Sequence, residues 1–119
     1  MPKKNDALKH QLEEASEINI TVTGRKSGRS ISRPVWFVWQ DGTLYLLPVK
    51  GSETQWYKNV LQNPSLQIEA GGTKAEVQAA PVTGKTEVSD VVAKFRAKYA
   101  GDVKKYYSKF DAAVVAKID

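Results

Sequence analysis

The sequence predicts a mainly β (α+β) domain in which six antiparallel strands close into a small barrel with short flanking helices. Six segments carry the alternation or the β-branched content of strands, and fewer carry a helical pattern. Two connections are the dipeptides Asp41-Gly42 and Gly71-Gly72, which are typical of tight hairpins. An open sheet of six strands would expose edges and apolar faces, so closure is expected. The 119 residues suffice for one core, and we expect a single domain over residues 1–119.

The first two elements are a helix and a strand. Leu8, Leu12 and Ala15 recur at helical spacing, which predicts a short amphipathic helix over residues 6–17. Residues 18–23 then alternate between apolar and polar side chains with many β-branched residues, the pattern of a half-buried strand.

Residues 30–40 predict a long second strand. Its apolar side chains occur on both parities, with Phe37 and Trp39 on one and Trp36 on the other, so both faces must be covered. Residues 43–49 return as a strand after the first hairpin dipeptide. The first three strands are therefore expected to form an antiparallel meander.

A central helix is predicted over residues 52–62. Ser52 and Gln55 have the spacing of a capping box, in which each side chain satisfies a backbone group at the start of a helix. Asn63 and Pro64 end the helix, because the residue before a proline avoids the helical conformation.

The C-terminal half completes the barrel. Its expected elements are strands over residues 65–70, 73–82 and 112–118, an amphipathic helix over residues 87–99 and a short helix over residues 102–109. Apolar residues on the outside of the barrel require a covering helix or a second subunit. We expect a homodimer.

Several classes of chemistry are excluded by composition. Without cysteine the chain has no disulfide, thiolate nucleophile or thiolate metal site, which is compatible with a cytoplasmic location. His10 is the sole histidine, so one chain assembles neither a Ser-His-Asp triad nor a histidine metal site. We expect no metal, no secretory signal and no membrane span, since no apolar run reaches about 18 residues. An enzyme of this composition would rely on a bound cofactor.

Two segments are suited to binding an anion. The net charge is +5, and the turn Thr23-Gly24-Arg25-Lys26-Ser27-Gly28 concentrates donors between two glycines. Lys50, Gly51 and Ser52 precede the central helix, whose first N–H groups also attract anions. A solvated basic hairpin explains the first segment equally well.

Four aromatic residues are candidates for holding a flat ring. Trp36 and Trp56 lie on a strand and on the following helix, and Tyr106 and Tyr107 belong to the C-terminal helical segment. Tryptophans of a small barrel are also common core residues. The residues alone thus indicate an anion attached to a flat ring.

The segment TVTGRKSGRSISRPVWFVWQDGTLYLLPVKGSETQWYKNVLQNPSLQIE, residues 21–69, resembles the deazaflavin-dependent nitroreductase family. The family pattern has TTTGRKSG, a strand with proline and aromatic residues, an SKGG-like turn and W-Y-x-N-L-x-x-N-P. The resemblance implies a split β-barrel and a reduced deazaflavin coenzyme, F-420. It further implies hydride transfer to a nitroaromatic, a quinone or another activated double bond.

Residue roles follow from the same resemblance. Arg25, Lys26 and Ser27 would hold the phosphate and acidic tail of the coenzyme, with Arg33 as a further cation. Lys50 and Gly51 would lie beside the phosphate or the ring, and Trp36 and Trp56 would border the ring and the substrate space. Tyr106 and Tyr107 are the candidates for a proton donor or a lid.

The sequence departs from the family pattern at two points. Ile31 replaces a residue that is often basic in the family, and Val49 replaces the serine of the SKGG-like turn. These departures keep three alternatives open. The first is FMN in the same groove, and the second is a non-catalytic carrier of a flavin or lipid. The third is a module for single-stranded nucleic acid, in which the basic turn is followed by the aromatic residues Trp36, Phe37 and Trp39.

Overall fold

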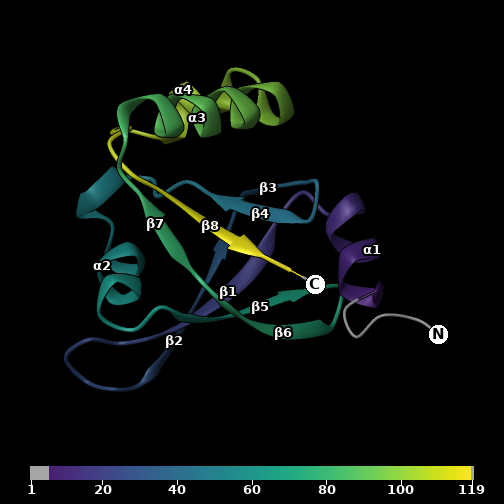
Figure 1. Cartoon of the computed structure of the whole chain (residues 1–119), viewed down its shortest axis with the longest axis vertical. Coiled ribbons are helices and arrows are strands. Elements are labelled where there is room, and N and C mark those ends of the chain that lie inside the picture. Colours follow the sequence, from purple (N-terminus) through teal and green to yellow (C-terminus); the bar gives the residue numbers. More distant parts are fainter. Residues whose placement is uncertain (1–5, 119) are drawn as a thin grey trace.

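The computed structural model describes residues 6–118 and contains two four-stranded antiparallel sheets with helices around them (Figure 1). The strands are β1 (Ile18–Thr23), β2 (Ser30–Val35), β3 (Phe37–Gln40), β4 (Thr43–Leu46), β5 (Ser65–Ala70), β6 (Thr73–Gln78), β7 (Ala80–Val82) and β8 (Ala113–Lys117). The helices are α1 (Asp6–Glu14), the 3-10 helix η1 (Gly51–Glu53), α2 (Gln55–Gln62), α3 (Lys85–Tyr99) and α4 (Asp102–Tyr106). The predicted mainly β fold class with short flanking helices is confirmed.

The strands are divided between two sheets, which are not closed into one hydrogen-bonded barrel within the described range. The order is β2-β1-β5-β6 in the first sheet and β3-β4-β8-β7 in the second. The predicted strand over residues 30–40 divides at Trp36, and the strand over residues 73–82 divides at Ala79. The predicted three-stranded meander is therefore wrong, because β2 and β3 belong to different sheets. Each divided segment instead makes a corner that joins the two sheets.

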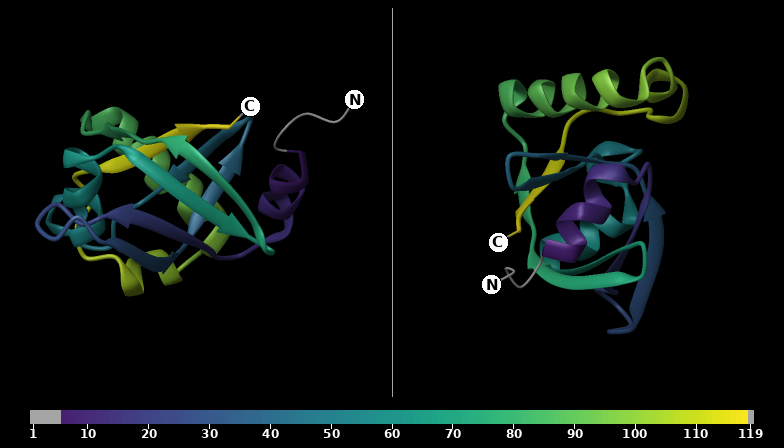
Figure 2. Two further views of the ribbon diagram at one scale, coloured as in Figure 1. Left: turned by 90° about the horizontal axis from the view of Figure 1, so that it is seen from below. Right: turned by 90° about the vertical axis from the view of Figure 1, so that its right-hand side faces the viewer.

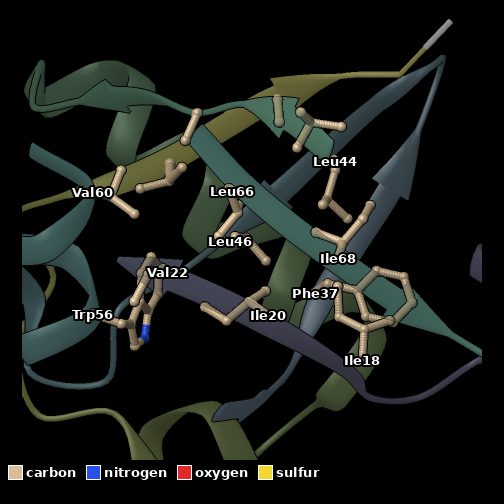
Figure 3. Packing of buried hydrophobic residues seen from close by; sticks show 14 of the residues in the cluster. Ile18, Ile20, Val22, Phe37, Leu44, Leu46, Trp56, Val60, Leu66 and Ile68 are labelled. Carbon is tan, nitrogen blue, oxygen red and sulfur yellow. The ribbon is translucent and has the colours of Figure 1, made fainter. Parts of the chain in front are cut away.

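The main core lies between the two sheets. Ile20 and Ile68 from the first sheet and Leu44 and Leu46 from the second are at most 1% exposed, and their side chains converge in Figure 3. Helix α1 closes one end of this core and α2 closes the other (Figure 1). This packing explains the period-two pattern of the strands, since one face of each inner strand is removed from water.

A second core covers the outer face of the sheet that contains β3 and β8. Val91, Val92 and Phe95 of α3 pack with Val38 of β3, and α3 lies across this sheet in Figure 2. The sheet is thus covered on both faces, as the apolar residues on both parities of residues 30–40 predict. The covering element is a helix of the same chain. No helix of residues 6–118 combines the length and the apolar content that crossing a membrane requires.

The start of the central helix differs from the predicted capping box. Residues 51–53 form η1, α2 begins at Gln55, and neither Ser52 nor Thr54 makes a side-chain capping bond. The Ser52 hydroxyl instead donates to the Asp111 carboxylate at 2.6 Å. A charged acceptor brought close by the fold competes successfully with the local capping bond, since hydrogen bonds to ionised groups are the stronger ones.

Candidate functional site

The basic turn between β1 and β2 is a closed loop held by its own backbone. The Gly24 N–H donates to the Arg29 carbonyl at 2.8 Å, and the Gly28 N–H donates to the Gly24 carbonyl at 2.9 Å. Gly28 has a φ of +71°, a conformation that glycine adopts without strain. The loop therefore holds Lys26 and Ser27 at its tip, where both line a cavity of about 310 Å³ against α2.

Arg25 ties this turn to the central helix. Its backbone N–H and its Nη1 both donate to the Asn59 Oδ1, at 3.1 and 2.8 Å. Its Nη2 donates to the Gln55 Oε1 at 2.9 Å. Asn59 is 4% exposed and is the one buried polar or charged residue of the described chain. The position of the turn is thus set by α2.

The cations around the turn form no ion pair with an acidic residue of the described chain. The ion pairs formed within residues 6–118 are His10 with Glu14, Lys58 with Glu53 and Lys109 with Asp111. None of them involves the four cations of the turn and β2, which are Arg25, Lys26, Arg29 and Arg33. This local excess of charge favours an anionic ligand.

A second cavity of about 410 Å³ lies beside the first and has aromatic walls. Trp36, Trp56, Tyr106 and Tyr107 line it together with Leu47, Val49 and other mainly apolar residues. Arg33 and Trp56 line both cavities. The predicted anion-binding turn and the predicted ring-binding aromatic residues therefore lie along one continuous surface.

The two tryptophans that line the cavity also pack against the cores, Trp56 as a buried residue and Trp36 as a half-buried one. Trp56 is 7% exposed and points from α2 toward Val22 of the main core (Figure 3). Trp36 stacks on Tyr99 with ring centroids 4.5 Å apart and meets Tyr106 edge-on at 5.7 Å. Both side chains are fixed by packing, so the cavity walls are preorganised.

The two C-terminal tyrosines differ in their surroundings. Tyr106 ends α4 and is 54% exposed at the mouth of the cavity, whereas Tyr107 is 6% exposed. The Tyr107 hydroxyl makes no hydrogen bond with any of residues 6–118. Every fully buried side-chain nitrogen or oxygen of that range does have a hydrogen-bond partner, so the Tyr107 oxygen is not fully buried. The hydroxyl must therefore reach accessible space, and the cavity is the space that Tyr107 lines. Burial, followed by the influence of Tyr99, raises the pKa of Tyr107 far above its ordinary value of 10.0.

The donors ahead of the central helix are used by the chain itself. The N–H groups of Lys50 and Gly51 donate to the Thr54 Oγ1 at 2.8 Å and to the Pro48 carbonyl at 3.1 Å. The Ser52 N–H donates to the Asp111 Oδ1 at 2.8 Å. Asp111 thus occupies the place where the sequence suggests an external anion. Neither Lys50 nor Gly51 lines either of the two cavities, so the structure does not bring this predicted pair to the site.

Three residues of the site were missed by the sequence interpretation, namely Asn59, Tyr99 and Asp111. Asn59 could have been identified from the sequence, because it is a polar residue between Trp56 and Val60 on the apolar face of a predicted helix. No sequence pattern could have identified Asp111 or Tyr99. Their partners Ser52 and Phe37 lie 59 and 62 residues away along the chain.

A family model described as "Uncharacterized protein conserved in bacteria (DUF2255)" matches residues 9–117. The chain belongs to this family. A search of the curated proteins found no match to this chain.

Solved structures with the same fold include a structure described as "F420-H2 Dependent Reductase (FDR-A)". It is 19% identical, with a TM-score of 0.67, and the match covers 86% of this chain and 94% of that one. A structure described as a domain-swapped dimer is 18% identical at a TM-score of 0.69, covering 97% and 100% of the two chains. A putative pyridoxamine 5'-phosphate oxidase from Listeria innocua is 14% identical at a TM-score of 0.70, covering 98% and 93%. At these identities the likeness concerns the fold.

Proposed function

We propose that this chain is a reductase that binds the deazaflavin coenzyme F-420 and passes a hydride to a small activated acceptor such as a nitroaromatic, a quinone or an enone. The observation that carries the proposal is the pair of adjoining cavities that share Arg33 and Trp56. One is cationic and the other is apolar with aromatic walls. A coenzyme with a flat ring at one end and several negative charges at the other matches this arrangement of an aromatic cavity beside a cationic one.

The cationic cavity fits the charged end of the coenzyme. Lys26, Ser27 and Arg25 would hold the phosphate, while Arg33 lies at the junction with the aromatic cavity. The cations of the turn have no acidic partner within the described part of the chain. The three cations that line this cavity, Arg25, Lys26 and Arg33, exceed what a single phosphate needs, which favours the longer acidic tail of F-420 over FMN.

The aromatic cavity fits the ring. Its volume of about 410 Å³ lies within the range that small-molecule sites occupy. Trp36 and Trp56 would border the ring. When bound, the reduced coenzyme supplies the hydride. The apolar walls exclude water, and the positive charge of Arg33 favours negative charge that develops on the ring or the acceptor.

Tyr107 would supply a hydroxyl group inside the aromatic cavity. A tyrosine hydroxyl is protonated at neutral pH, and burial raises the pKa of Tyr107 further, so the hydroxyl is a hydrogen-bond donor. A donor aimed at a nitro or carbonyl oxygen stabilises the charge that a hydride leaves there. Tyr106, which is exposed and lines the same cavity, would act as a lid.

The alternatives differ in what supports them. FMN shares the phosphate and the flat ring, and the fold likeness to a putative pyridoxamine 5'-phosphate oxidase keeps it as the second candidate. A carrier without turnover would use the same cavity. The nucleic-acid alternative loses one of its three stacking residues, because Phe37 is 0% exposed.

We also propose a homodimer. Val49, Tyr106 and Phe110 are exposed apolar side chains, and the first two line the mouth of the aromatic cavity. A second copy would cover them. Sedimentation at micromolar concentration tests this proposal, and a strict monomer would contradict it.

Fluorescence titration tests the coenzyme. Trp36 and Trp56 line the proposed ring site, so F-420 and FMN are each added to the purified protein while tryptophan emission is followed. We expect saturable quenching, tighter with F-420, in the wild type and in a Trp39→Phe variant that lacks the third tryptophan. Oxidation of reduced F-420 with a panel of nitroaromatics and quinones then separates an enzyme from a carrier. Absence of quenching with both coenzymes would end the redox proposal.

A further inference from the structure

The cation that opens the basic turn is held entirely by neutral oxygens. The Arg25 guanidinium donates to amide oxygens of Asn59 and Gln55, at 2.8 and 2.9 Å. These residues lie 34 and 30 positions away along the chain, on the first two turns of α2. The contacts therefore fix where the turn sits relative to the central helix and relative to both cavities.

Asn59 is placed at a position where an apolar residue would be expected. It is 4% exposed on the helix face that also buries Trp56, Tyr57 and Val60. A buried amide loses hydrogen bonds to water and destabilises the fold unless partners replace them. Its Oδ1 accepts both the Arg25 N–H and the Arg25 Nη1, which gives the amide a specific partner in the turn.

The choice of an amide has an electrostatic consequence. A carboxylate at either position would form a charge-assisted pair with the guanidinium and bind it more strongly. It would also cancel the charge of Arg25 beside the cavity that Lys26 and Arg33 line. The amide oxygens hold the guanidinium in place and leave its charge available. Three of its five N–H groups remain for a ligand, since one of each terminal nitrogen is used.

We propose that Asn59 and Gln55 are positioning and specificity-determining residues that fix the Arg25 guanidinium without neutralising it, so that the turn presents a rigid, uncompensated cationic cradle for a phosphate-bearing anion. This inference rests on the proposed function, because it concerns the charged end of the same site. It assigns the selection for anions to two neutral residues on α2 in addition to the cations themselves.

The decisive variant is Gln55→Glu, because the proposal predicts opposite changes in stability and binding. Gln55 is exposed and is the first residue of α2, where an acidic side chain is favourable. We expect an equal or higher midpoint of urea unfolding together with roughly tenfold weaker binding of inorganic pyrophosphate, the probe, at low salt. Binding is measured by calorimetry and by the emission of Trp56, which lines the same cavity.

The matched control is Gln40→Glu. Gln40 is exposed at the end of β3, and the β3–β4 turn lies near α1, away from the β1–β2 turn (Figure 1). It adds the same charge to the protein, so its pyrophosphate affinity should stay within about twofold of the wild type. Asn59→Asp provides a second measurement, with the hydrogen bonds to Arg25 kept and pyrophosphate binding again reduced about tenfold.

The outcomes separate this inference from the proposed function. Pyrophosphate affinity that is unchanged in Gln55→Glu and Asn59→Asp, or a wild type that does not bind pyrophosphate, overturns the inference. Weakening in both variants without quenching by F-420 or FMN supports the cradle and rejects the proposed coenzymes. If F-420 or FMN quenches the emission of both variants with the same affinity as the wild type, the proposed function is supported and the role of the two amides is rejected.

Discussion

The indole of Trp36 and the phenol ring of Tyr99 lie face to face, with centroids 4.5 Å apart and planes inclined by 8°. Trp36 is the residue at which the chain leaves one sheet for the other, and Tyr99 is the last residue of α3. The Tyr99 hydroxyl accepts the Phe37 N–H at 3.0 Å, and its single proton is shared between the carbonyls of Phe37 and Ser16, at 2.7 and 2.9 Å. This pair links the sheet crossing, the aromatic cavity and the covering helix.

The first prediction concerns that hydroxyl. Tyr99→Phe keeps the stack on Trp36 but leaves the Phe37 N–H without its acceptor, whereas the Phe37 carbonyl keeps the hydrogen bond from the Lys98 Nζ at 2.9 Å. We therefore expect a loss of about 1 to 3 kcal/mol in the free energy of unfolding. Urea denaturation measures it. Tyr45→Phe is the control, because the half-buried Tyr45 hydroxyl makes no hydrogen bond within residues 6–118, and its effect should stay within about 0.5 kcal/mol. Equal losses in the two variants would refute a specific role for the Tyr99 hydroxyl.

The second prediction concerns Tyr107 and rests on the proposed function. Since its hydroxyl has no partner in the described chain, Tyr107→Phe should change the free energy of unfolding by less than about 0.5 kcal/mol. If the hydroxyl donates to the acceptor, turnover should fall by roughly 100-fold with little change in coenzyme affinity. Stopped-flow oxidation of reduced F-420 and tryptophan quenching give the two readouts. Unchanged turnover would remove this hydroxyl from the mechanism.

The third prediction concerns the decrease in the free energy of unfolding at acidic pH. The hydrogen bond from the Ser52 hydroxyl, above all, holds the pKa of Asp111 below its ordinary value of 3.8. A carboxyl group with a lowered pKa in the folded state adds stability above pH 3.8, and this stability is lost as the pH falls through the folded pKa. Asp111→Asn removes the charge and keeps an acceptor oxygen for the Ser52 N–H, while its amide nitrogen donates to the Ser52 hydroxyl instead of accepting from it.

We therefore expect the Asp111→Asn variant to be less stable than the wild type at neutral pH and to lose less stability on acidification. Urea denaturation between about pH 7 and pH 3 measures both slopes. Asp90→Asn, at an exposed position of α3, should leave the slope of the wild type unchanged. If the stability of Asp111→Asn depends on pH as steeply as that of the wild type, the contact between Asp111 and Ser52 does not contribute to the pH dependence of stability.

The fourth prediction concerns Gly51. Its φ is +55°, and a Cβ at this position would meet the Asp111 carboxylate. Gly51→Ala should therefore cost at least about 2 kcal/mol, from backbone strain and from displacement of Asp111. Gly42→Ala has a comparable φ of +75° with no atom near its Cβ, so about 1 kcal/mol from strain alone is expected. Thermal or urea unfolding compares the pair, and equal costs would show that the space beside Asp111 is not limiting.

Much of the secondary structure could be predicted because its causes are local. The alternation of residues 18–23 and the dipeptides at positions 41–42 and 71–72 specify strands and hairpins through backbone sterics and side-chain parity. The division of the second strand at Trp36 could not be predicted in this way. Both halves remain extended, and the change of sheet depends on which distant strand each half pairs with.

The candidate site shows the same limit. The sequence identified the basic turn and the aromatic residues, and the structure brings Lys26 and Ser27 into a cavity that adjoins the one lined by Trp36 and Trp56. Sequence reasoning also proposed free backbone donors before the central helix, whereas Asp111 and Thr54 use those of Ser52 and Lys50. Spacing shows where donors are, but it does not show which other part of the chain will reach them first.

The amino-acid sequence by itself determined the strands, the hairpins, the concentration of positive charge after the first strand and the absence of thiol chemistry, because each depends on residue type and on neighbours within a few positions. Only the tertiary structure decided that Asp111 takes the Ser52 donors, that Asn59 holds Arg25 and that Arg33 and Trp56 join two cavities. These contacts connect residues far apart in the chain. Hydrogen-bonding groups buried by packing must find partners, and the packing of the sheets and helices determines which partners come within reach.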